Sequence, residues 1–211
     1  MNSPYSYIDP DCAYTDPRTG VLRNLADIQD AEALVFAESG AVAKRLNELV
    51  AAPIKIVGVG SLFEIHRQLF QDIYGWAGKA RTVEISKGGR QFFPTSRFET
   101  AFCHIDNLIK ECQRIGYAEK RDLAHKLAEL LDTINYLHPF REGNGRTQRE
   151  FLRLLAQEKG WDLNLNPPDN TDVYNRYMSG TIDGDVEKLS DLISDLLEEY
   201  PSKSARISNG R

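Results

Sequence analysis

Apolar residues recur at steps of three and four along most of this chain, which is the period of an amphipathic helix. In residues 27–50, for example, the pattern passes through Leu34, Val42 and Leu49. The same period marks residues 61–78, 98–115, 120–137, 151–155 and 189–197. These segments predict a mainly α fold, a bundle of about seven helices without internal repeats.

Two local signals bear on the helix boundaries. Gly40 lies inside the first pattern, where a glycine weakens a helix, so this helix is open to interruption there. Ser61 is followed three residues later by Glu64, which is the spacing of a capping box. This pair predicts that the second helix starts at Ser61.

One short stretch departs from the helical period. Residues 81–85 and 91–93 are predicted to be two short strands around a turn, together a β-hairpin. Two short strands cannot form a core of their own, so the hairpin must pack on helices. No linker-like segment divides the chain. We therefore expect one domain over residues 1–200, including an arm and helix at 14–50, and a frayed tail at 201–211.

Charge and cysteine content exclude several classes of protein. The chain has 26 Lys and Arg against 31 Asp and Glu, a net charge of −5, whereas nucleic-acid binders present a basic surface. Cys12, Cys103 and Cys112 contain no Cys-x-x-Cys pair, so neither a disulfide framework nor a zinc knuckle is indicated. No stretch approaches the roughly 18 apolar residues of a membrane span. We expect a cytoplasmic protein without membrane or nucleic-acid partners.

The segment His138-Pro-Phe-Arg-Glu-Gly-Asn-Gly-Arg-Thr-Gln-Arg149 lies between two helical patterns and is the most informative part of the chain. Its Gly-Asn-Gly run stands at the opening of a helix. Backbone N–H groups are bare there and the helix dipole is positive, so the run predicts an anion site. The glycines let a phosphate approach the main chain.

Charged side chains surround that run. Arg146 and Arg149 are three residues apart on the first helical turn, and two cations suit a polyphosphate better than a single carboxylate. Glu142 is placed to bind phosphates through Mg²⁺, and His138 supplies a base with a pKa near the working pH. Each residue alone has an ordinary interpretation as a cap, a turn or a solvated face. Their combination favours phosphoryl or nucleotidyl transfer.

The same segment matches the motif of the Fic family, His-Pro-Phe-x-(Asp/Glu)-Gly-Asn-Gly-Arg-x-x-Arg, at every specified position. A chance match in a chain of this length is on the order of one in a billion. The resemblance continues outside the motif: residues 62–78 are similar to the family's helix before its flap, 85–92 to the flap, and 14–30 to an arm of many bacterial members. It covers most of residues 14–200.

The resemblance implies a Fic-type helical bundle and transfer of AMP from ATP to a Ser, Thr or Tyr hydroxyl of a target protein. His138 would deprotonate the hydroxyl, Glu142 would hold Mg²⁺ between the α- and β-phosphates, and Phe140 would anchor the loop. The residues assigned to the ATP phosphates are Gly143, Asn144, Gly145, Arg146, Thr147, Gln148 and Arg149.

The hairpin would be the family's flap, which pairs with an extended segment of the target. A strand with a free edge is a liability unless it binds something, although a plain surface hairpin is the alternative. The residues assigned to target docking are Lys87, Gly88, Gly89 and Phe92.

Outside the motif, two further sets of residues have a functional and an ordinary interpretation. The first could line an adenine pocket, because its tyrosines are three apart and share a face if the stretch is helical; surface aromatics are the alternative. This set is Tyr174, Asn175 and Tyr177. The second set, His66, His104 and His125, shows no metal-ligand spacing and is interpreted as structural.

Many family members are restrained by a helix with the pattern (Ser/Thr)-x-x-x-Glu-(Gly/Asn), whose glutamate pairs with the second motif arginine, here Arg149. This chain has no strict match. Ser194 and Glu198 have the spacing, but Glu199 follows, and the neighbouring leucines favour a packing face. We therefore expect that a separate small antitoxin-like protein inhibits this one. The protein itself could be a toxin or an effector that is delivered into another cell. The alternatives are transfer of a phosphoryl, UMP or phosphocholine group, and a nucleotide-responsive binding module without turnover.

Overall fold

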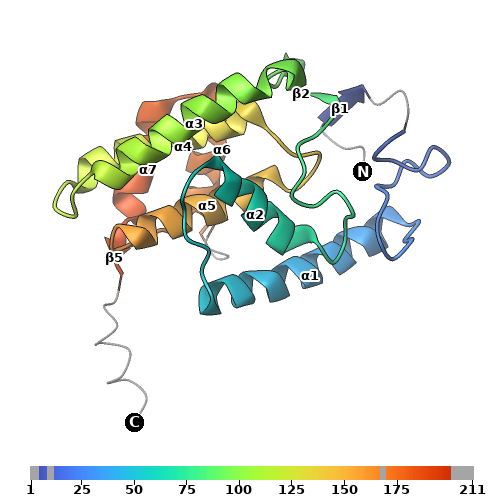
Figure 1. The fold of residues 1–211 in the computed structure, drawn as a ribbon, viewed down its shortest axis with the longest axis horizontal. Coiled ribbons are helices and arrows are strands. Elements are labelled where there is room, and N and C mark those ends of the chain that lie inside the picture. The colour runs from blue at the N-terminus through green and yellow to red at the C-terminus, as the bar shows by residue number, and fades with distance from the viewer. Residues whose placement is uncertain (1–4, 9–11, 167–169, 201–211) are drawn as a thin grey trace, which may run out of the picture.

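The structure, a computed structural model, describes residues 5–8, 12–166 and 170–200 (Figure 1). The tail expected at 201–211 lies outside the described residues. The described part is mainly helical, which confirms the predicted fold class. Its helices are α1 (Ala31–Ala51), α2 (Val59–Phe70), α3 (Phe98–Arg114), α4 (Lys120–Leu137), α5 (Asn144–Glu158), α6 (Thr171–Asp183) and α7 (Val186–Leu196), with a 3-10 turn at Thr95–Arg97.

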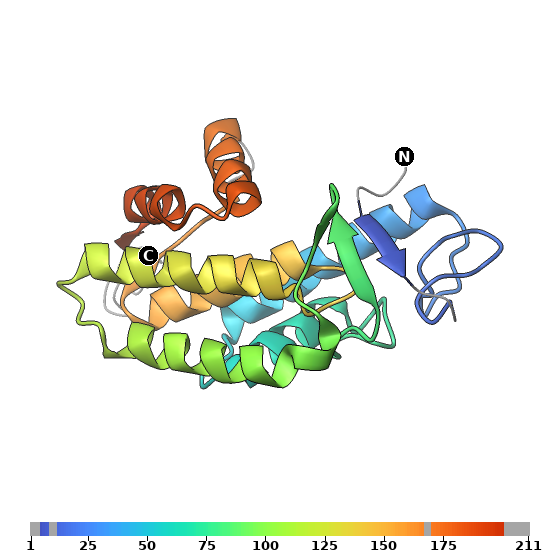
Figure 2. The same ribbon diagram turned by 90° about the horizontal axis from the view of Figure 1, so that it is seen from above.

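Helix α4 is the centre of the bundle. It packs against α3, α5 and α7, while α5 packs in turn against α2, and α2 against α1. Leu127 and Leu131 of α4 and Phe151 and Leu155 of α5 are fully buried in one core. Figure 2 shows α6 and α7 together on one side of α4. No helix in the described part of the chain is long and apolar enough to cross a membrane.

The first two helices differ from the sequence prediction, and the second ends at Phe70, well before Gly78. Helix α1 runs without interruption through Gly40, with Asp30 as its N-cap. Helix α2 begins at Val59, and Ser61 does not cap it: its hydroxyl accepts from the Val57 N–H and donates to the Lys55 carbonyl. The Val59 N–H instead donates to a carboxylate oxygen of Asp106 in α3, 2.6 Å away. A carboxylate from a distant helix has thus taken the role that the capping box predicts for Ser61.

The hairpin is present with shifted strands and a third partner. Strand β2 (Glu84–Lys87) pairs with β3 (Arg90–Gln91) around a two-residue turn. Gly88 and Gly89 occupy that turn with φ of 56° and 78°, a conformation that glycine adopts without strain. On the other edge of β2 lies β1 (Tyr5–Ile8), antiparallel, with Tyr5 opposite Lys87. This sheet lies across one end of α3 and α4 (Figures 1 and 2). A second pair, β4 (Trp161–Asp162) and β5 (Glu198–Glu199), is formed near the C-terminal end of the described chain.

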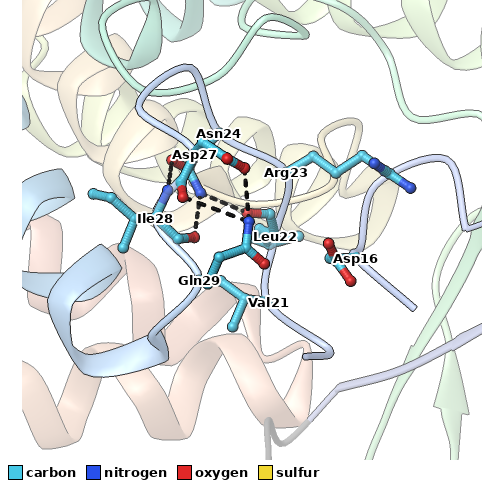
Figure 3. Close-up of a pocket in the computed structure, with 8 residues that line it drawn as sticks. All are labelled: Asp16, Val21, Leu22, Arg23, Asn24, Asp27, Ile28 and Gln29. Atoms are coloured by element: carbon cyan, nitrogen blue, oxygen red, sulfur yellow. Dashed lines mark hydrogen bonds between the residues drawn. The ribbon is translucent and has the colours of Figure 1, made fainter. Parts of the chain in front are cut away.

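The arm before α1 is an ordered loop with its own polar centre. The Asn24 side chain donates to the carbonyls of Leu22 and Ile28 and accepts from the Ile28 N–H, as Figure 3 shows. Tyr14 packs edge-on against Trp76, with ring centroids 5.6 Å apart. A small pocket in the arm is lined by Asp16, Val21, Leu22, Arg23, Asn24, Asp27, Ile28 and Gln29. No motif residue lines this pocket, so it is not the candidate active site.

Candidate active site

His138 ends α4 in a left-handed conformation, with φ of 46°. Its side chain is 7% exposed, and its Nδ1 lies 3.3 Å from the carbonyl of Asn135. Because a carbonyl only accepts, Nδ1 carries the proton and the lone pair is on Nε2. Burial lowers the pKa of His138 to about 3, well below the value expected from the sequence. The imidazole is therefore neutral, and so in its basic form, at neutral pH.

Arg81 joins the flap to the loop that carries His138. Its guanidinium is buried and donates to the carbonyls of His138, Val83 and Phe93 at 2.8, 2.6 and 2.6 Å. Its backbone N–H donates to the Pro139 carbonyl at 2.7 Å. One residue, through its side chain and its backbone N–H, thus fixes the backbone at His138 and Pro139. Sequence reasoning missed it, because an arginine in a short strand pattern is normally exposed.

The flap covers the histidine. The Phe92 ring stacks on the His138 imidazole with centroids 3.9 Å apart, and Arg90 donates to the Ile182 carbonyl of α6 at 2.8 Å. Lys87 closes β2, beside the glycine turn. Because β1 pairs with β2 on the side away from β3, β1 and β3 are the two edge strands of the described sheet. Of the docking residues expected from the sequence, Phe92 contacts the motif through this ring stacking.

Phe140 and Asn144 hold the motif loop in shape. Phe140 is buried and stacks on His66, with centroids 3.8 Å apart. The Asn144 amide accepts from the Phe140 N–H and donates to the Phe140 carbonyl. Gly143 has a φ of 81°, and a Cβ there would overlap the Phe70 ring. The Asn144 side chain therefore holds the shape of the loop, and the Asn144 backbone N–H has no acceptor among the described residues.

His66 holds the motif loop through hydrogen bonds on both ring nitrogens. It accepts from the Gly78 N–H at Nδ1, 2.8 Å, and its Nε2 lies 3.0 Å from the Glu142 carbonyl. These partners require a neutral ring with its proton on Nε2, and burial lowers the pKa of His66 to about 4. The structural interpretation of His66 is thus correct, and its contact fixes the residue expected to bind the metal.

The amino end of α5 is bare. Gly143 is its N-cap and provides no side-chain acceptor. Within the described part of the chain, the N–H groups of Asn144, Gly145 and Arg146 have no acceptor. These donors point along the helix axis where the dipole is positive, so they form an anion site.

The two motif arginines have different surroundings. Arg146 pairs with Glu38 at 2.6 Å and with Glu142 at 3.6 Å. Arg149 lies over the Tyr177 ring, 5.6 Å from its centroid, and forms no ion pair with a described carboxylate. Arg149 is therefore the motif arginine with its charge uncompensated in this part of the chain.

Thr147 and Gln148, which the sequence assigned to the phosphates, face the protein interior instead. The Thr147 hydroxyl donates to the Gly143 carbonyl at 2.9 Å, and the Gln148 amide donates to the Tyr177 hydroxyl. Both side chains are buried. They lie on the face of α5 opposite Arg146 and Arg149, because 3.6 residues per turn place the intervening positions on the other side. Their side chains are structural.

The residues of the expected adenine pocket lie in different environments on α6. Tyr177 is buried against α5, whereas Tyr174 is 49% exposed. Asn175 lines a surface hollow between α6 and α7 with Arg176, Ser179, Lys188 and Asp191. The two tyrosines are three apart on one helix but differ in exposure, and the Tyr177 ring lies under Arg149. The adenine pocket remains a prediction.

Glu142 has the chemistry to hold a magnesium ion. Its Oε1 accepts from the Gly143 N–H at 2.9 Å, while Oε2 has no hydrogen-bond donor among the described residues. No group of three or more His, Cys, Asp and Glu among these residues could hold a metal on its own. A single carboxylate beside an anion site suits Mg²⁺, which binds one or two carboxylates together with substrate phosphates.

Comparison with known proteins agrees with this geometry. Residues 58–156 match the Fic/DOC family. The chain is 33% identical over 199 residues to protein adenylyltransferase VbhT of Bartonella schoenbuchensis, covering 93% of this chain and 41% of that protein. It is 31% identical over 196 residues to the probable protein adenylyltransferase Fic of Escherichia coli K12, covering 88% and 92%. Its fold is similar to that of the BepC protein of Bartonella tribocorum with bound AMPPNP, with a TM-score of 0.77, 20% identity, and coverage of 90% and 98%.

Proposed function

Since the chain belongs to the Fic/DOC family, we propose that it is a protein adenylyltransferase, which transfers AMP from ATP to a hydroxyl side chain of a target protein. The observation that carries this proposal is the junction of α4 and α5. A neutral, buried histidine ends one helix, and bare N–H groups with two arginines begin the next. A base beside a polyphosphate site is the arrangement that nucleotidyl transfer requires.

In the proposed reaction, the hydroxyl oxygen of the target forms a bond to the α-phosphorus of ATP. The bond from that phosphorus to the oxygen bridging to the β-phosphate breaks, and pyrophosphate leaves with the electron pair. His138 accepts the hydroxyl proton at Nε2. The N–H groups of α5 bind the phosphate oxygens, and Arg146 and Arg149 stabilise the charge on the leaving pyrophosphate.

Glu142 would hold Mg²⁺ through its carboxylate, and the bound ion would supply neutralisation of the negative charge on the nucleotide phosphates. His66 keeps the Glu142 backbone in place through the hydrogen bond to its carbonyl. The chain's own contribution is therefore a fixed carboxylate next to the anion site.

The target would add a strand to the open edge of β3. Main-chain hydrogen bonds to a sheet edge align an extended segment without regard to its side chains, and β3 leads directly to Phe92 over His138. This arrangement favours a Ser, Thr or Tyr in an extended loop of the target. The adenine ring would lie near α6, at Tyr174 and Asn175.

Labelled ATP tests the proposal. We expect label from the α-phosphate to remain on protein and label from the γ-phosphate to be released. His138→Ala should abolish labelling while ATP binding, measured by calorimetry, stays within about threefold of wild type. Label retained only from the γ position would show phosphoryl transfer instead. ATP binding without any transfer in the wild-type protein would favour a binding module.

The regulator would be a separate inhibitory protein of the antitoxin type. Arg149 has no carboxylate partner in the described part of the chain, so no described residue makes the inhibitory contact that the family resemblance implies. Ser194 is in α7, whereas Glu198 is exposed in β5. Glu198→Gly is expected to leave labelling unchanged. A several-fold rise in labelling by this variant, or failure to co-purify any inhibitor from the native host, would contradict the proposal.

A further inference from the structure

A buried carboxylate outside the motif contacts the first motif arginine. Glu38, in the middle of α1, is 8% exposed. Its Oε1 lies 2.6 Å from Nη2 of Arg146, and its Oε2 accepts a hydrogen bond from the Tyr74 hydroxyl. Glutamate is rarely buried unless it is paired. Both oxygens of this carboxylate are therefore committed to fixed partners.

Arg146 is held from more than one direction. Its guanidinium lies over the Phe70 ring, 4.8 Å from the centroid, and Glu142 approaches Nη2 at 3.6 Å. Arginine has five N–H donors in a rigid fork. The bond from Nη2 to Glu38 leaves other donors of the fork for a phosphate, and the side chain is 28% exposed. The contact with Glu38 thus orients the arginine and leaves N–H donors of its guanidinium available for a phosphate.

This contact differs from an inhibitory one. A carboxylate that blocked the phosphates would itself pair with Arg149 or accept from the N–H groups at the amino end of α5. Glu38 makes no such bond: its described partners are the side chains of Arg146 and Tyr74. It is also fixed on α1 between the core residues Leu34 and Val42. Its position suits support of Arg146 more than occupation of the anion site.

We propose that Glu38 is a positioning residue for nucleotide binding, which together with Tyr74 fixes the Arg146 guanidinium for a phosphate of ATP. This inference rests on the proposed function, because it assigns Arg146 to a phosphate. The sequence did not single out Glu38. It lies in a long amphipathic helix remote from the motif, where a glutamate is normally a solvated surface residue.

The test separates binding from turnover. Glu38→Ala is expected to raise KM for ATP and the calorimetric Kd about tenfold, the effect of losing one charged hydrogen bond, with kcat changed less than about twofold. Glu38→Gln keeps an acceptor for Arg146 and should restore both constants to within about threefold of wild type. Tyr74→Phe should have an intermediate effect. Glu48→Ala is the matched control, since Glu48 pairs with Arg45 on the same helix.

A double variant tests whether Glu38 acts through Arg146. In an Arg146→Ala background, Glu38→Ala should weaken ATP binding no further. Equal KM and Kd in wild type and Glu38→Ala would overturn the inference. Tighter ATP binding in both Glu38 variants would also overturn it, because it would show that Glu38 inhibits ATP binding. A loss shared equally by Glu38→Ala and Glu38→Gln, with a matching fall in Tm, would show a merely structural role.

The two proposals can fail separately. If the wild-type protein binds ATP but transfers no label from the α-phosphate, the proposed function fails, while the Kd series still tests Glu38. If the wild-type protein transfers AMP and Glu38→Ala has the wild-type Kd, only the inference about Glu38 fails. Absence of ATP binding by the wild-type protein would overturn both.

Discussion

Acid is expected to destabilise this protein through His66, beneath the motif loop. Burial lowers the pKa of His66 from 6.5 to about 4, because the ring is enclosed by Phe70 and Phe140. The folded protein keeps the ring neutral, whereas the unfolded chain takes up a proton below pH 6.5. The stabilisation is therefore complete above pH 6.5 and is lost as the pH falls toward 4.

The magnitude follows from this shift. Between about pH 7.5 and pH 5, proton uptake by His66 in the unfolded chain lowers the free energy of unfolding by about 2 kcal/mol. His66→Phe keeps an aromatic ring but leaves the Gly78 N–H and the Glu142 carbonyl without partners. We expect this variant to be roughly 2–4 kcal/mol less stable than wild type at pH 7.5. Because phenylalanine does not titrate, the difference should shrink by about 2 kcal/mol at pH 5.

Urea unfolding, followed by circular dichroism at several pH values between about 5 and 7.5, measures this difference directly. His138 is present in both proteins, so its own proton uptake cancels in the comparison. His104→Phe, at an exposed position of α3, controls for the loss of a histidine. A gap between wild type and His66→Phe that stays constant with pH would refute the reasoning.

Three more substitutions test the loop and the flap. Gly143→Ala should cost roughly 2–4 kcal/mol in urea unfolding and reduce AMP transfer at least tenfold, because its Cβ would overlap Phe70; wild-type activity would contradict the need for glycine. Arg81→Met removes the donor to the carbonyls of His138 and Phe93, so a loss of roughly 2–4 kcal/mol is expected, with a change below about 0.5 kcal/mol counting against its role. Phe92→Ala exposes the His138 ring to water and should raise its pKa. The acid limb of the pH–rate profile should then move to higher pH, and an unmoved limb would show that Phe92 does not shield the base.

The motif helix shows how far sequence reasoning reaches. Arg146 and Arg149 lie on one partly exposed face of α5, as their spacing predicts. Gln148 lies on the buried face, which the apolar period already indicated, since Phe151 and Leu155 follow it by three and seven residues. The apolar period of α5 therefore already indicates that the Gln148 side chain faces the core and not the phosphates.

For three other residues, the local sequence contains no signal of the contacts that they make. Arg81 binds the backbone at His138, Glu38 binds Arg146, and Asp106 caps α2 at Val59. In each case the two partners are far apart along the chain. A charged residue in a helix or strand pattern is ordinarily exposed, so only the packing of α1, α3 and the flap around the motif reveals these contacts.

The motif region is less positive than its arginine content indicates. Arg153 forms a two-point ion pair with Glu150, and Arg146 pairs with Glu38. Attraction of an anion therefore depends mainly on Arg149 and on the bare N–H groups of α5. Salt screens exposed charges strongly, whereas fixed and partly buried dipoles are screened much less. Such a site is expected to retain a triphosphate at salt concentrations that would release it from a surface patch of lysines and arginines.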